Sequence, residues 1–310
     1  MVMRYLKLCP VIFLVIGMTI TTAAQETAAP APDSAVTASA LPPAADAKEI
    51  VRRSVEIDHH NFERARNYTC RQREVERELA KDGGVKSTHI RTFEITFLAG
   101  EPYSRLVQKD DKPLSDNDQK KEEEKMEKFI AKHRDESEKD RQKRLAKEEK
   151  ERQESRLFLR DVINAFDFKL LGEEQLEGKD TYVIEAVPRK DFHPTQPHAD
   201  LLEKVRGKLW IEKQDYNWVK ADVETIDTIS FGLFLARLHK GSRLTFEQTK
   251  VNDEVWLMRR LAVNASARLA LLKNIAMDQE DIFSDYKKFS TGTRIVGFSE
   301  LEPVKKTEPQ

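Results

Sequence analysis

Short segments of alternating apolar and polar residues, joined by turn sequences, are the feature that most constrains the fold of this chain. In the stretch 93–97, for example, Phe93, Ile95 and Phe97 are separated by a glutamate and a threonine. A strand that buries one face and exposes the other needs this period of two residues. The connections are short and polar, such as Lys-Asp-Gly-Gly at 81–84, and this is typical of hairpins.

Ten segments carry this strand pattern. We predict strands over Cys70–Leu79, Val85–Leu98, Tyr103–Lys109, Phe168–Gln175, Asp180–Pro188, Lys208–Lys213, Trp218–Ile226, Ser242–Lys250, Val255–Ala265 and Ile275–Tyr286. Because most successive strands are joined by short turns, the sequence predicts a meandering antiparallel sheet. A helix is expected before the first strand, since Asp46 can cap a segment in which apolar residues recur at helical spacing.

A long charged segment interrupts the strand pattern. Between Gln119 and Arg156, 26 of 38 residues are charged, 14 basic and 12 acidic, with no continuous apolar stripe. Ser115 and Asp118 form a start typical of a capping box, so we predict a helical insertion at about 116–166. One interpretation is a solvated helix held by i,i+4 ion pairs, and the alternative is an arm that binds a partner protein. If the helix continues through the more apolar residues that end at Phe166, it has about 50 residues and is about 75 Å long at about 1.5 Å per residue.

The N-terminus predicts export. Arg4 and Lys7 precede an apolar run over Leu8–Ile20, and small residues follow it, so we interpret residues 1–24 as a cleaved signal peptide. About 13 apolar residues are too few to span a bilayer, so no integral membrane span is expected after cleavage, and the product is expected in the periplasm or secreted. Residues 25–47 are rich in Ala and Pro and predict a disordered linker. We expect one domain over 48–303 and a disordered tail over 304–310.

The sequence carries no pattern typical of catalysis or of metal binding. The formal net charge is −1, which argues against a nucleic-acid partner. Phosphate-binding glycine loops and a Gly-x-Ser-x-Gly elbow are absent, so we predict neither an enzyme nor a cofactor. His59 and His60 are adjacent on a helix and point about 100° apart, which disfavours shared metal coordination. Cys70, the one cysteine outside the leader, is interpreted as a buried free thiol.

The stretch Ile229–Leu238 is rich in apolar residues and contains a single charge, Arg237. Phe231, Phe234 and Leu238 recur at helical spacing, so one hypothesis is a helical lid with this face directed at the sheet. The alternative is an ordinary covering segment of the core.

Two stretches resemble a known superfamily. GKLWIEKQDYNWVKAD at 207–222 is similar to the apolar-Trp-apolar strand, charged turn and returning strand of the periplasmic lipoprotein carriers, the LolA/LolB/RseB-like proteins. FKLLGEEQLEGKDTYVIEAVPRK at 168–190 is similar to the hairpin that precedes it in those proteins. The resemblance extends from about Tyr68 to Phe289, without the charged insertion, which the compact carriers lack.

The resemblance implies an α+β fold in which a strongly curved antiparallel sheet forms an incomplete β-barrel around an apolar cavity. It implies a non-enzymatic periplasmic protein that holds lipid or the acyl chains of a lipoprotein. The alternative is an RseB-like envelope sensor or scaffold that binds a protein partner through the charged helix. The resemblance and the lid hypothesis together give eleven candidates for lining the cavity or its lid: Phe93, Ile95, Phe97, Tyr182, Ile184, Trp210, Phe231, Phe234, Leu238, Phe246 and Trp256.

Overall fold

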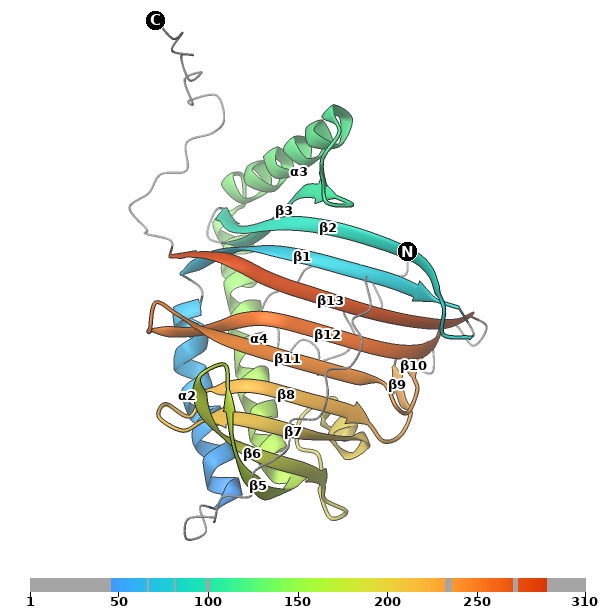
Figure 1. Ribbon diagram of the computed structural model, residues 1–310. Coiled ribbons are helices and arrows are strands. Elements are labelled where there is room, and N and C mark those ends of the chain that lie inside the picture. Colours follow the sequence, from blue (N-terminus) through green and yellow to red (C-terminus); the bar gives the residue numbers. More distant parts are fainter. Residues whose placement is uncertain are drawn as a thin grey trace, which may run out of the picture.

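The computed structural model describes residues 46–65, 67–80, 82–98, 101–231, 236–269 and 273–288 (Figure 1). The predicted signal peptide, nearly all of the predicted linker and the predicted tail lie outside these residues. In order, the elements are α2 (Ala47–Ala65), β1 (Tyr68–Leu79), β2 (Val85–Leu98), β3 (Glu101–Lys109), β4 (Lys112–Pro113), α3 (Asp116–Arg134), α4 (Glu138–Ala165), β5 (Phe166–Leu176), β6 (Lys179–Pro188), η3 (Ala199–Lys204), β7 (Val205–Glu212), β8 (Trp218–Thr225), β9 (Ile229–Phe231), β10 (Ala236–Leu238), β11 (Arg243–Val251), β12 (Val255–Leu269) and β13 (Lys273–Lys288).

All strands in the described ranges belong to one antiparallel sheet. Its main order is β4-β3-β2-β1-β13-β12-β11-β8-β7-β6-β5, and β9 and β10 attach to β12 beside this path. The ten predicted strands are present, and the predicted antiparallel sheet that stays open is confirmed. The pairing of β1 with β13 is non-local and joins two hairpin series, β1–β4 and β5–β13, into one surface.

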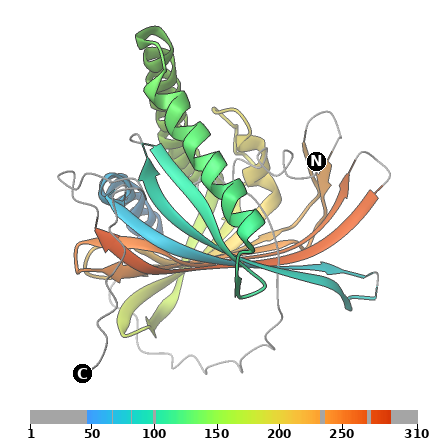
Figure 2. The same ribbon diagram turned by 90° about the horizontal axis from the view of Figure 1, so that it is seen from above.

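The sheet is curved, and helices cover its concave side (Figure 2). Helix α2 begins where Asp46 accepts a hydrogen bond from the amide of Lys48 (3.0 Å). Its buried residues Ile50 and Val51 pack against sheet residues that include Ile184 and Leu209. This contact fixes which face of the sheet is the core.

The charged insertion is helical, as predicted, but it consists of two helices. Ser115 starts α3 by accepting a hydrogen bond from the amide of Asp118. After Arg134 the chain turns, and Ser137 starts α4 by accepting from the amide of Asp140. A single helix of about 50 residues was therefore the wrong expectation, because a second Ser-capped start lies inside the charged run.

The insertion joins the two ends of the open sheet. It leaves from β4 at one edge and re-enters at β5, which forms the other edge. In Figure 1, α3 lies beside β3 and α4 descends behind the sheet toward β5. Within the described ranges, no helix is long and apolar enough to cross a membrane.

The predicted helical lid over Ile229–Leu238 is wrong for its described part. Strands β9 and β10 pair with each other, with Phe231 opposite Ala236, and β10 also pairs with β12. Phe234 lies outside the described residues. An apolar run fits both a helix and a strand, and here the free edge of β12 supplies backbone partners that favour strands.

Helix α3 covers the edge of the sheet at β3. The buried Glu122 side chain accepts a hydrogen bond from the backbone amide of Leu106 (3.4 Å) and forms an ion pair with Lys125. Tyr103 of β3 lies against Phe129 of α3, with 4.9 Å between the ring centroids. Such cover removes an edge amide that could otherwise pair with another chain.

We expect Glu122→Ala to lower the free energy of unfolding by about 1 kcal/mol, since it leaves the Leu106 amide without its acceptor. The neighbouring exposed residue supplies a control, Glu123→Ala, which should change stability by less than about 0.5 kcal/mol. Urea unfolding of both variants measures this difference. Equal effects would contradict a role for Glu122 in covering the edge.

Candidate functional site

The register of the sheet places long rows of side chains on the concave face, because directly paired residues point to the same side. One row runs from β5 to β12 through Leu170, Ile184, Leu209, Ala221, Phe246 and Leu261. A second row, also from β5 to β12, contains Phe168, Ala186, Gly207, Val223, Leu244 and Val263. This part of the concave face is therefore apolar from one strand to the next.

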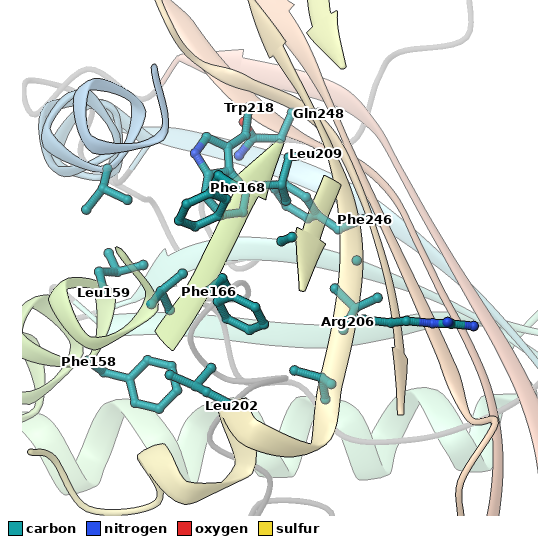
Figure 3. Close-up of a pocket in the computed structure, with 16 residues that line it drawn as sticks. Phe158, Leu159, Phe166, Phe168, Leu202, Arg206, Leu209, Trp218, Phe246 and Gln248 are labelled. Carbon is teal, nitrogen blue, oxygen red and sulfur yellow. The ribbon is translucent and has the colours of Figure 1, made fainter. Parts of the chain in front are cut away.

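An apolar cavity of about 130 Å³ lies on this part of the face. Its lining comes from α2, α4, η3 and strands β5 to β8 and β11, namely Val55, Phe158, Leu159, Val162, Phe166, Phe168, Ala186, Leu202, Val205, Arg206, Gly207, Leu209, Trp218, Val223, Phe246 and Gln248. Figure 3 shows phenylalanines of α4 and β5 facing residues of the sheet across the cavity. An engineered apolar cavity of about 150 Å³ binds benzene, so this space has the size of a small apolar group or of part of a chain.

Among the described residues of the lining, one is ionisable: Arg206, whose side chain extends away from the cavity (Figure 3). Its guanidinium bonds to Glu224 at 3.0 Å. The indole of Trp218 donates to Ser54 of α2 (2.7 Å), so its polar atom is satisfied within the wall. A wall of this kind favours apolar contents and supplies no acid, base or nucleophile.

One side of the cavity is closed by the segment from β6 to η3. Asp161 of α4 is buried and accepts hydrogen bonds from the amides of Thr195 (2.9 Å) and Gln196 (3.0 Å). The hydroxyl of Thr195 also donates to this carboxylate (2.6 Å). These bonds hold the segment against α4 and place Leu202 in the lining.

Of the eleven residues predicted to line the cavity or its lid, Phe246 lies in the lining. Ile184 and Tyr182 pack in the adjoining core beneath α2, and Leu238 packs against the cluster that contains Phe158. Phe93 and Ile95 are buried on β2, and Phe97 is half-buried there, toward the other end of the sheet. Phe231 lies in β9, where its side chain is not described, and Phe234 lies outside the described residues.

The two tryptophans that were predicted to line the cavity, Trp210 and Trp256, lie outside it. Trp210 is paired with Val183 and Lys220, so it points to the side opposite Leu209. It packs with Val219 and Trp256 in a separate cluster, and its indole donates to Glu174 (2.8 Å). Placing Trp210 and Trp256 in the cavity was therefore wrong.

The tryptophan that does line the cavity is Trp218. An irregularity in the pairing of β7 with β8 sets Ile211 opposite Trp218 and leaves Val219 outside the register. Such a bulge reverses the alternation, so counting residues along the strand gives the wrong face. The apolar end of the charged insertion, with Phe158, Val162 and Phe166, was a signal in the sequence that pointed to the lining of α4 and β5.

The character of the concave face changes beyond β12. The first row continues through Asp281, Glu74 and Arg91, and the second continues through Gln279 and Glu76, followed by His89. Arg91 and Glu74 form an ion pair at 2.9 Å. This polar face, defined here as the concave side of β13, β1 and β2, adjoins the apolar one.

Asp281 is a buried carboxylate of the polar face. Gln72 donates to it at 3.2 Å and Gln279 at 2.9 Å. Burial outweighs these hydrogen bonds and raises the pKa of Asp281 to about 6. In the described ranges, no group of three or more His, Cys, Asp or Glu residues has the arrangement of a metal site.

Cys70 is buried beside Ile95 and Phe283, as the sequence predicted for a free thiol. Burial raises the pKa of this thiol to about 12. The thiolate is therefore scarce at neutral pH, which disfavours a nucleophilic role.

No protein-family model matches the sequence, and no curated protein matches it. Similar solved structures include a domain assigned to outer membrane lipoprotein sorting from Vibrio parahaemolyticus, with 15% identity, a TM-score of 0.32 and coverage of 79% of this chain and 95% of that one. A LolA superfamily protein from Nitrosomonas europaea has 14% identity, a TM-score of 0.26 and coverage of 80% and 94%. The Pseudomonas aeruginosa MucA/MucB complex has 9% identity, a TM-score of 0.23 and coverage of 79% and 100%. These include the superfamily that the sequence resembles; the likeness concerns the fold alone, and no function is transferred from it.

We expect Asp281→Asn to stabilise the protein in a pH-dependent way. Because the folded state raises the pKa of this carboxyl from 3.8 to about 6, the native protein binds its proton more tightly than the unfolded chain does. The contribution of Asp281 to stability is therefore fully present below about pH 4 and is lost as the pH rises to about 6. The gain of the variant over the parent should grow over this range to about 3 kcal/mol. Urea unfolding from pH 4 to 7 measures it, and a gain that does not change with pH would contradict the assignment.

Proposed function

We propose that this protein is a non-enzymatic binding protein that holds part of an apolar chain, such as the end of an acyl chain of a lipid or an acylated protein, in the cavity between α2, α4 and the sheet. The observation that carries the proposal is an apolar space in whose described lining the one ionisable residue, Arg206, directs its charge away from the space. The other polar side chains of this lining are Gln248 and Trp218, and the Trp218 indole is bonded to Ser54. A polar group placed there would therefore lose its water with little compensation, whereas an apolar group would not.

The size of the cavity limits what it holds. A volume of about 130 Å³ accommodates a chain end and not a whole lipid. The enclosing parts differ in how they are held: the sheet is continuous, whereas α4 and the segment before η3 meet through the Asp161 hydrogen bonds. We propose that longer chains enter by displacing this side of the cavity.

We further propose that the chain works outside the cytoplasm, in the periplasm or as a secreted protein. The support is the basic residues, apolar run and small residues of the predicted signal peptide over 1–24. N-terminal sequencing of the exported protein tests it, and a chain that retains Met1 would contradict cleavage.

An alternative function, binding a protein partner through the charged insertion, is favoured by the exposure of the first part of α4. Leu145 is 45% exposed there, and Ile130 on α3 is 38% exposed. Neighbouring ion pairs such as Lys147 with Glu151 (3.6 Å) lie along the helix surface and contribute little to stability. We expect Leu145→Ser to leave folding unchanged and to reduce co-purification of an envelope protein; unchanged partners would contradict this alternative.

The cavity proposal is tested by filling the space. Ala186 is buried and lines the cavity, so Ala186→Leu places three further carbons inside it. We expect affinity for a fluorescent fatty acid to fall by at least about fivefold, which corresponds to about 1 kcal/mol, with no loss of thermal stability.

The control for this test is Val187→Leu. Val187 is the next residue on β6, points to the opposite face and is 45% exposed, so the same side chain added there should leave the affinity unchanged. Tight binding by the Ala186→Leu protein, or no binding by the parent, would show that this cavity is not the site.

A further inference from the structure

We propose that the ligand is an amphiphile that carries a protonated amine, with its chain on the apolar face and its ammonium group on the polar face of β13, β1 and β2. This inference rests on the proposed function, because it assigns the head group of the molecule whose chain the cavity holds.

The first argument is the position at which the concave face changes from apolar to polar. In the two rows that cross the sheet, every residue from β5 to β12 is apolar or glycine. The next strand, β13, contributes Asp281 and Gln279 to the same rows. Adjacent strands lie about 4.8 Å apart, so Asp281 lies about 10 Å from the cavity residue Phe246, two strands away. The described lining of the cavity ends at β11, so a ligand has to extend about 10 Å further, across β12, to reach Asp281.

The second argument is the sign of the charge. Asp281, Glu74 and Glu76 stand on this face against Arg91. Lys109 follows Arg91 in the first row, but its ammonium is bound to Asp118 of α3 at 2.8 Å. His89, at the end of the second row, is exposed. Among the described residues of this face the carboxylates outnumber the cations, so the polar face favours a positively charged group.

Neighbouring groups offset only part of the cost of burying the negative charges of Glu76 and Asp281. Burial raises the pKa of Glu76 as well as that of Asp281, although Arg91 acts in the opposite direction on both. A cation placed beside them would offset part of this desolvation, whereas a carboxylate or phosphate would add to the repulsion.

The third argument is a buried acceptor that lacks a donor. Gln72 is 4% exposed, and its amide nitrogen donates to Asp281, while its Oε1 atom has no hydrogen-bond partner among the residues that the structure describes. Gln72 is opposite Phe283 and Phe93, at the border of the carboxylates. An ammonium group has three donors and no acceptor, so it can satisfy Oε1 and the neighbouring carboxylate together.

The experiment compares two probes with the same chain and opposite head groups, dodecylamine and dodecanoate, at pH 7.5 and below their micelle concentrations. Isothermal titration calorimetry gives both affinities for the intact protein. We expect dodecylamine to bind at least about tenfold more tightly, a difference of about 1.4 kcal/mol. In the double variant Asp281→Asn, Glu76→Gln the two affinities should become nearly equal.

The matched control is Glu280→Gln. Glu280 lies between Gln279 and Asp281 on β13, points to the other face and binds Arg260 at 2.5 Å. This variant should keep the preference for dodecylamine, because its charge is not on the concave face. Circular dichroism and urea unfolding of each variant establish that the sheet is intact.

The outcomes separate this inference from the proposed function. Equal affinities of the parent for both probes, or tighter binding of dodecanoate, would overturn the amine assignment and leave the apolar site standing. A preference that survives in the double variant would overturn the polar face as its source. If neither probe binds, the proposed function fails together with this inference.

Discussion

The pairing of β1 with β13 is the interaction on which the rest of the structure depends. It joins residues about 200 positions apart in an antiparallel ladder, from Tyr68 opposite Lys288 to Leu79 opposite Ala276. Without it, β1–β4 and β5–β13 would be two separate sheets. With it, the ends of the combined sheet are β4 and β5, and the charged insertion has to connect them. Eleven strands at about 4.8 Å extend about 48 Å across the sheet, and the 28 residues of α4 extend about 42 Å, so a helix of this length suits the crossing.

This crossing explains why a charged segment takes part in an apolar site. The first part of α4 is exposed and polar, whereas its last turns bring Phe158 and Val162 onto the concave face. The same helix holds the segment before η3 through Asp161. The cavity is thus built where the insertion returns to the sheet, and its wall combines the second half of the insertion with strands that follow it in the chain.

The concave face is divided between an apolar and a polar part, and the division follows the strand order. Strands β5 to β12 contribute apolar side chains to the rows that cross the sheet, while β13, β1 and β2 contribute Asp281, Glu74 and Arg91. The border therefore lies next to the non-local ladder. The apolar part is closed by α2 and α4, which bury it from water.

The sequence by itself determined the strands, their turns and the helical nature of the insertion, because these follow from periods of two residues, turn residues and helix caps within short stretches. The resemblance placed Phe246 among the candidates for the lining, and the sequence showed that the insertion ends in apolar residues. Tertiary structure alone decided the faces and the neighbours. The irregular pairing of β7 with β8 turned Trp218 toward the cavity, while Trp210 faces the other side. Likewise, the edge of β12 made strands of the described parts of Ile229–Leu238. Local patterns contain neither bulges nor pairings between distant strands, since both depend on the free energy of the whole sheet.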